Sequence, residues 1–216
     1  MEAEARTIGG KEVCIRGSDD SLCILTFHAD FDENELQRLM DSVPECTMAS
    51  VRIDDWNQEL SPWKADPVFG DEGFGDGAEK LLEEITEKII PEIGCGRFAV
   101  GGYSLAGLFS LWACYNTDMF CGCAASSPSV WFPGWDSYIG NNRFRAGKSY
   151  LSLGDKESRT RNPVMSTVGD RIVLQSEALK RQIGDDNVML EWNKGNHFKD
   201  VTERKARSFQ WLIGQL

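Results

Sequence analysis

The chain has 216 residues, of which 41% are hydrophobic and 26% are charged, as in an ordinary globular protein. Its 34 acidic and 23 basic residues give a formal net charge of −11, and a field of that sign repels phosphate backbones and anionic membrane surfaces. No apolar run approaches the roughly 20 residues that span a bilayer. We therefore expect neither nucleic acid nor a membrane as a partner.

The number and spacing of the cysteines and histidines indicate the cellular compartment and whether a metal is bound. The seven cysteines lie mostly in apolar segments, as buried reduced thiols do. There is no Cys-x-x-Cys pair, and a total of two histidines argues against a zinc cage. The N-terminus is acidic and polar, unlike a signal peptide. These features predict a cytoplasmic protein with no metal and no cofactor.

Hydrophobic periodicity predicts alternating strands and helices, without an internal repeat or a linker. The predicted strands cover 13–15, 22–27, 49–53, 98–100, 121–125, 150–153 and 188–192. Helical spacing of apolar residues covers 36–43, 78–89, 105–112, 172–183 and the C-terminal segment, with the second helix ending near Pro91. This alternation predicts one α/β domain over residues 1–216, with a mostly parallel sheet covered by helices on both faces.

Three irregular stretches, 54–76, 126–148 and 154–169, are longer than connections require. Each follows the carboxyl end of a predicted strand, and ligand sites of such sheets lie beyond those ends. We therefore expect the three stretches to converge on a site.

Residues 97–109, Arg-Phe-Ala-Val-Gly-Gly-Tyr-Ser-Leu-Ala-Gly-Leu-Phe, have the most specific pattern. An apolar strand ends at a serine flanked by small residues, and a helix begins at once, which is the pattern of a nucleophile elbow. So sharp a turn imposes strained backbone angles on Ser104 and leaves residues 102 and 106 room for a hydrogen or a methyl group. Glycines that only pack a helix on a strand produce a similar pattern, so the interpretation also requires a base and an acid.

A serine hydroxyl is a weak nucleophile until a base takes its proton, and an acid must fix the tautomer of that base. His197 follows the last predicted strand in a polar, glycine-containing loop, which suits the order serine, acid, histidine. Two carboxylates, Asp155 and Glu157, compete for the role of the acid after strand 150–153. Asp136 is a more distant candidate.

Charge develops on the substrate carbonyl oxygen during attack, so backbone donors are expected near Ser104. One should be the N–H of Leu105, immediately after the serine. The second should come from the loop after strand 22–27, at Ala29 or Asp30. His28, at the end of that strand, is expected on the same side of the site, or else it is structural.

Aromatic side chains in the strand-end loops are candidates for a substrate pocket. Trp56, Trp131 and Trp135 could wall an apolar or aromatic pocket together with His28. Alternatively, the tryptophans pin the long loops onto the domain.

Residues 101–109 (GGYSLAGLF), 154–157 (GDKE) and 195–198 (GNHF) resemble the esterase branch of the α/β-hydrolase superfamily. That branch includes siderophore esterases, feruloyl esterases and S-formylglutathione hydrolases, and the resemblance extends from about residue 11 to the C-terminus. It implies an α/β-hydrolase fold with a minimal cap domain or none. An acid three residues beyond the strand-end glycine is general in this superfamily, which favours Glu157 over Asp155.

The resemblance further implies hydrolysis of small carboxylic esters through an acyl-enzyme, with Ser104, Glu157 and His197 as the catalytic triad. This sequence departs from the family by Ala106 at the second glycine of the elbow and by lacking a His-Gly pair at the oxyanion loop. A peptidase, a thioesterase or an acyltransferase would use the same residues. A non-catalytic binding module on this fold is the alternative from another class, and the oligomeric state stays open.

Overall fold

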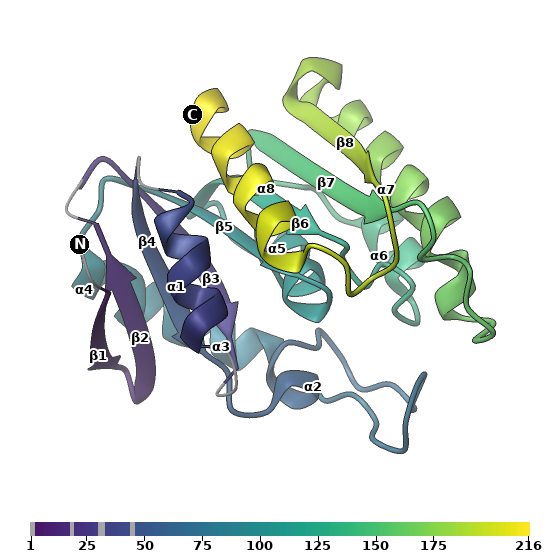
Figure 1. Cartoon of the computed structure of the whole chain (residues 1–216), viewed down its shortest axis with the longest axis horizontal. Helices are drawn as coiled ribbons and strands as arrows, with labels where there is room; N and C mark the ends of the chain where they lie inside the picture. Colours follow the sequence, from purple (N-terminus) through teal and green to yellow (C-terminus); the bar gives the residue numbers. More distant parts are fainter. Residues whose placement is uncertain (1–2, 18–19, 30–32, 44–45) are drawn as a thin grey trace.

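The computed structural model describes residues 3–17, 20–29, 33–43 and 46–216, and Figure 1 shows its elements. Among these residues, one eight-stranded sheet has the order β1-β2-β4-β3-β5-β6-β7-β8. The strands are β1 (Glu4–Ile8), β2 (Lys11–Arg16), β3 (Leu22–His28), β4 (Thr47–Arg52), β5 (Arg97–Tyr103), β6 (Phe120–Ser126), β7 (Lys148–Gly154) and β8 (Val188–Asn193). The β1–β2 and β2–β4 pairs are antiparallel and all others are parallel.

The central strands β3, β5, β6 and β7 are buried along most of their length because helices cover both faces of the sheet. In β3, Cys23, Leu25 and Phe27 enter the larger core on one face, whereas Leu22 and Ile24 enter the smaller core on the other. Successive side chains of a strand point to opposite faces, so this division follows from backbone geometry. The predicted sheet, mostly parallel and covered on both faces, is confirmed.

Helices α1 (Glu33–Asp41) and α8 (Val201–Gln215) lie side by side on one face, in front of the sheet in Figure 1. Their contact with the strands forms the smaller core. The larger core lies under α3 (Ala78–Glu84), the π-helical segment η1 (Ile85–Ile89), α4 (Ile90–Ile93), α5 (Leu105–Asn116), α6 (Trp135–Asn141) and α7 (Val168–Ile183). Every residue of α5 from Leu105 to Tyr115 is buried, which fixes the position of the elbow.

The helix predicted to end near Pro91 runs on to Ile93, where Gly94 adopts a left-handed conformation with φ 74°. A proline inside a helix lacks one N–H donor. The π-helical turn immediately before α4 already departs from the regular α-helical hydrogen bonds, which fits the proline in its place.

Besides the 3-10 turns η2 (Met165–Thr167) and η3 (Asp185–Asn187), three elements are absent from the sequence prediction. Strand β1 is mostly exposed, so it lacks the alternation of apolar residues that marks a half-buried strand. Helix α2 (Trp56–Glu59) and helix α6 lie in stretches predicted to be irregular. Beyond the strand ends, the described residues add loops, 3-10 turns and these short helices, without a separate cap domain.

Candidate active site

Ser104 stands at the turn between β5 and α5 with φ 57° and ψ −121°, a strained conformation for a residue with a side chain. Such a conformation costs about 1–3 kcal/mol and persists where surrounding contacts impose it. The turn brings the backbones so close that a Cβ atom on Gly102 would lie 2.7 Å from the carbonyl carbon of Ala106. The strain and the crowding expected of a nucleophile elbow are therefore both observed.

The structure brings together three side chains from the ends of β5, β7 and β8. His197 Nε2 lies 3.0 Å from Ser104 Oγ, although 93 positions separate the two residues in the sequence. His197 Nδ1 lies 2.8 Å from Glu157 Oε2. Parallel strands end at the same edge of the sheet, so their loops meet there. We call this arrangement the Ser104–His197–Glu157 network.

The other two candidate acids have different partners. Asp155 Oδ1 accepts a hydrogen bond of 2.8 Å from the backbone N–H of Gly195. Asp136 makes an ion pair of 3.0 Å with Arg171. Asp155 therefore ties the β7 loop to the histidine loop, and the carboxylate that reaches His197 is Glu157.

Glu157 is held by several donors in a buried site, where 4% of its side chain is exposed. Its Oε1 accepts hydrogen bonds from Gly154 N–H at 2.7 Å, Ser127 Oγ at 2.7 Å and the Arg204 guanidinium at 2.9 Å. Burial raises the pKa of this carboxyl, but the hydrogen bond and charge of His197, with the bonds from Ser127 and Arg204, outweigh burial and lower the pKa to about 2. The carboxylate is thus ionised at neutral pH.

Arg204 is a contact of the network that the sequence prediction missed. Its side chain is 1% exposed, and it also donates to Ser127 Oγ and to the carbonyl of Asn196. The guanidinium lies 5.3 Å from the ring centroid of Tyr103. Nothing in the basic segment 204–207 distinguishes this residue, because only the packing of α8 places it inside.

Tyr103, directly before the elbow serine, contacts the backbone of the loop that carries His197. Its hydroxyl donates a 2.7 Å hydrogen bond to the carbonyl oxygen of His197. Burial raises the pKa of this phenol to about 12, so it stays a donor at neutral pH. The position of His197 is therefore set through its backbone as well as its ring.

Two serines after β6 also contact the network. Ser127 has φ 43° and donates to Glu157, while Ser129 Oγ lies 3.4 Å from Ser104 Oγ. The signal for both was present in the sequence, since the polar run 126–129 directly follows a predicted strand.

A cavity of about 250 Å³ opens beside Ser104. Besides Ser104 itself, three predicted site residues line it: His28, Ala29 and Trp56. Most of the remaining wall is apolar, with Phe27, Leu36 and Val201 among its residues. The only charged residues of the described lining, Glu35 and Lys205, form an ion pair of 4.0 Å.

The two other predicted pocket residues differ in outcome. Trp131 lines a second hollow, of about 180 Å³, together with His197, Lys156, Arg159 and the exposed Phe198. Trp135 is completely buried, so the prediction that it walls a pocket is wrong. Helix α6 turns this side chain into the core, where its indole N–H donates to Gln175 at 2.9 Å.

The two residues predicted to supply oxyanion donors lie next to Ser104 and in the wall of the cavity beside it. Leu105 is the first residue of α5, and the N–H groups of a first helical turn lack partners within the helix. Ala29 lies in the cavity wall after β3. The alternative, Asp30, lies outside the described residues.

Comparison with known proteins identifies the fold. No family model and no curated protein matches the sequence. The strand order, with the elbow after β5 and the histidine after β8, is that of the α/β-hydrolase fold. None of the helices in the described ranges has both the length and the hydropathy needed to cross a membrane.

Solved structures with this fold include several esterases. An IroE-like serine hydrolase from Shewanella oneidensis matches with a TM-score of 0.78 at 14% identity, over 99% of this chain and 80% of that one. The siderophore hydrolase EstA from Aspergillus nidulans matches with a TM-score of 0.70 at 16% identity, over 95% of this chain and 90% of that one. The enterobactin esterase from Shigella flexneri matches with a TM-score of 0.66 at 14% identity, over 99% of this chain and 60% of that one.

Proposed function

We propose that the chain is a serine esterase that cleaves small carboxylic esters through an acyl-enzyme. Ser104 is the nucleophile, His197 the general base and Glu157 the acid that orients the imidazole. The observation that carries the proposal is the continuous Ser104–His197–Glu157 network, which joins a strained serine to a buried, ionised carboxylate. The siderophore hydrolase and the enterobactin esterase among the structural neighbours support ester hydrolysis.

In the first half of the proposed reaction, Ser104 Oγ attacks the ester carbonyl carbon while His197 Nε2 takes the hydroxyl proton. The carbonyl oxygen becomes an oxyanion and accepts hydrogen bonds from the N–H groups of Leu105 and Ala29, each of which contributes about 3–4 kcal/mol by deletion. The C–O bond to the alcohol then breaks, and His197 returns the proton to the departing alkoxide. The acyl group remains on Ser104.

In the second half, a water molecule attacks the acyl carbon and His197 Nε2 accepts a proton from it. Collapse of the tetrahedral intermediate breaks the bond to Ser104 Oγ, and His197 protonates that oxygen. A carboxylic acid leaves. In both halves, the negative charge of Glu157 stabilises the transient imidazolium, which explains why several donors hold this carboxylate ionised.

The cavity limits the size of the substrate part that binds beside Ser104. A volume of about 250 Å³ is below the common range of about 300–1,000 Å³ for ligand pockets, so one short acyl or alcohol group fits. Its mostly apolar wall favours a hydrocarbon or aromatic group there. The second hollow, which His197 lines, is available to the other part of the ester.

The test is a panel of p-nitrophenyl esters of increasing acyl length, assayed with wild type, Ser104→Ala and His197→Ala. Each variant should lose roughly 10⁴- to 10⁶-fold in kcat while it keeps the wild-type circular dichroism spectrum. Ser137→Ala removes an exposed serine of α6 and should leave turnover unchanged. A folded wild type without esterase activity would instead favour a binding module on this fold.

A further inference from the structure

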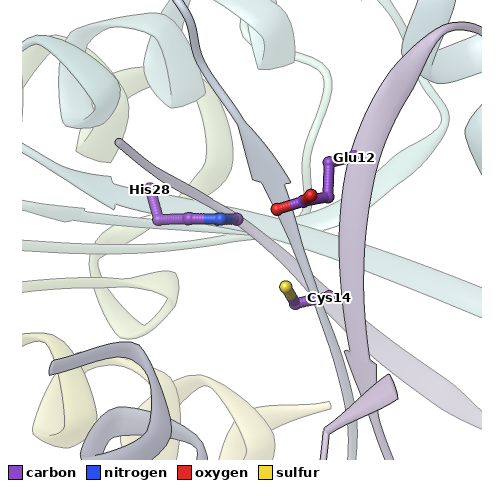
Figure 2. Close-up of side chains that lie close together, drawn as sticks. All are labelled: Glu12, Cys14 and His28. Atoms are coloured by element: carbon purple, nitrogen blue, oxygen red, sulfur yellow. The ribbon is translucent and has the colours of Figure 1, made fainter. Parts of the chain in front are cut away.

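Three side chains with metal-binding atoms converge at the N-terminal part of the sheet, on strands other than those that carry the Ser104–His197–Glu157 network. Figure 2 shows Glu12 and Cys14 from β2 turned toward His28 at the end of β3. One donor atom of each, a carboxylate oxygen, a thiol sulfur and an imidazole nitrogen, lie within 4.8 Å of one another.

The sheet register explains the convergence. Glu12 and Cys14 are two positions apart on β2, so their side chains point to the same face. Strand β4 lies between β2 and β3, with Ser50 opposite Cys14. Ser50 Oγ lies 2.8 Å from His28 Nδ1, which directs the imidazole across β4 toward β2.

We propose that Glu12, Cys14 and His28 bind a divalent cation of the zinc type. Thiolate, imidazole and carboxylate are the three ligand classes of Zn²⁺ in proteins, and catalytic zinc sites commonly have three protein ligands. On binding, the cation displaces the proton of the Cys14 thiol. The resulting thiolate and the Glu12 carboxylate together balance the two positive charges, and a net charge of −11 favours cation uptake.

The distances require a modest closure of the cluster. Bonds of about 2.0–2.3 Å in tetrahedral geometry separate donor atoms by roughly 3.3–3.7 Å, so no separation within the cluster has to shrink by more than about 1.5 Å. Glu12 is exposed and has three side-chain torsions with which to make this adjustment. Cys14 and His28 are half-buried, so they form the more rigid part of the site.

The surroundings of the cluster resemble those of metal-bound histidines. A histidine ligand usually has its second ring nitrogen held by a hydrogen-bonding partner, and Ser50 fills that place at His28. Arg52 lies opposite His28 on β4, and its Nε is 3.4 Å from Oδ1 of Asp54, a carboxylate outside the cluster.

The site would also touch the cavity of the proposed esterase. His28 lines the cavity beside Ser104, so a bound cation would stiffen one part of that wall. Three protein ligands leave one position of a tetrahedral cation for water or another ligand. Sequence spacing does not reveal this site, because two ligands lie on one strand and the third lies two strands away in the sheet.

Titration of the metal-free full chain with Zn²⁺ by calorimetry, and with Co²⁺ by absorption spectroscopy, tests the proposal. We expect one high-affinity equivalent and a thiolate-to-cobalt charge-transfer band. Cys14→Ser should abolish the band, and Cys14→Ser and His28→Gln should each weaken binding by roughly 100-fold or more, because loss of even an outer partner costs 10- to 100-fold. The control Cys121→Ser, at another half-buried cysteine, should bind as wild type does.

Thermal unfolding supplies a readout that is independent of metal spectra. Zn²⁺ should raise the Tm of wild type and of Cys121→Ser, but not that of Cys14→Ser, because only the folded sheet assembles the three ligands. The absence of a high-affinity equivalent, or unchanged binding in Cys14→Ser, would refute the site. None of these readouts depends on ester hydrolysis, so the metal site and the proposed esterase can fail separately.

Discussion

Arg204 offers a quantitative test of how the network is held. It is buried against Glu157, and the ordinary pKa of 4.5 for that carboxyl is lowered to about 2 in the folded protein. When a carboxyl has a lower pKa in the folded protein than in the unfolded chain, its ionisation stabilises the fold at any pH above the pKa of the unfolded chain. That contribution, here about 3 kcal/mol, is lost as the pH falls from about 4.5 to about 2.

We expect Arg204→Met to lower the free energy of unfolding by about 3–5 kcal/mol at neutral pH, because it leaves a buried carboxylate without its cation. The difference from wild type should narrow as the pH falls toward about 3.5, because the variant loses one of the contacts that lower the pKa of Glu157 and so protonates this carboxyl at a higher pH than wild type does. Arg204→Lys, which keeps the charge, should lose less.

Urea denaturation followed by tryptophan fluorescence at both pH values measures these differences. Arg207→Met is the matched control on the same helix, since its side chain is 45% exposed and its ion pair with Glu191 is 3.5 Å long. That substitution should cost less than about 1 kcal/mol. Equal losses in the two methionine variants, or a loss in Arg204→Met that does not change with pH, would show that Arg204 does not compensate the buried charge of Glu157.

Three further substitutions test separate parts of the site. Glu157→Gln should lower kcat by roughly 10²- to 10⁴-fold with little change in KM, because the imidazolium loses its counter-charge; steady-state kinetics on one ester would show it. Gly102→Ala places a Cβ 2.7 Å from the Ala106 backbone, so urea denaturation should show a free energy of unfolding about 2–3 kcal/mol lower. In the control Gly140→Ala the new Cβ would meet no atom within 4 Å, so the free energy of unfolding should not change. Trp56→Ala enlarges the cavity and should shift kcat/KM toward longer acyl chains; an unchanged chain-length profile would show that substrates do not use this wall.

The parts of the structure that depend on local pattern were predictable from the sequence. The elbow at Ser104 was predictable because its apolar strand, its small residues and its helix follow one another directly in the sequence. The structure has the same order. The meeting of Ser104 with His197 follows from topology, since all loops after parallel strands open on one edge of the sheet.

The parts that depend on packing were not predictable. Trp135 was expected at a pocket because it lies in the long stretch 126–148 after a strand end. Helix α6 places its side chain in the core instead. Arg204 has the sequence surroundings of a solvated helix residue, yet α8 packs it against Glu157. In both cases the outcome depends on which side of a helix faces the core, and one charged or aromatic residue does not reveal that side.

Reaction with a fluorophosphonate, followed by peptide mass spectrometry, reports directly whether Ser104 is an activated nucleophile. An activated serine attacks phosphorus and displaces fluoride, whereas ordinary serines do not react. We expect one adduct per chain, on Ser104, and little labelling in His197→Ala. A folded protein that forms no adduct, or an adduct that persists in Ser104→Ala, would contradict this role of Ser104.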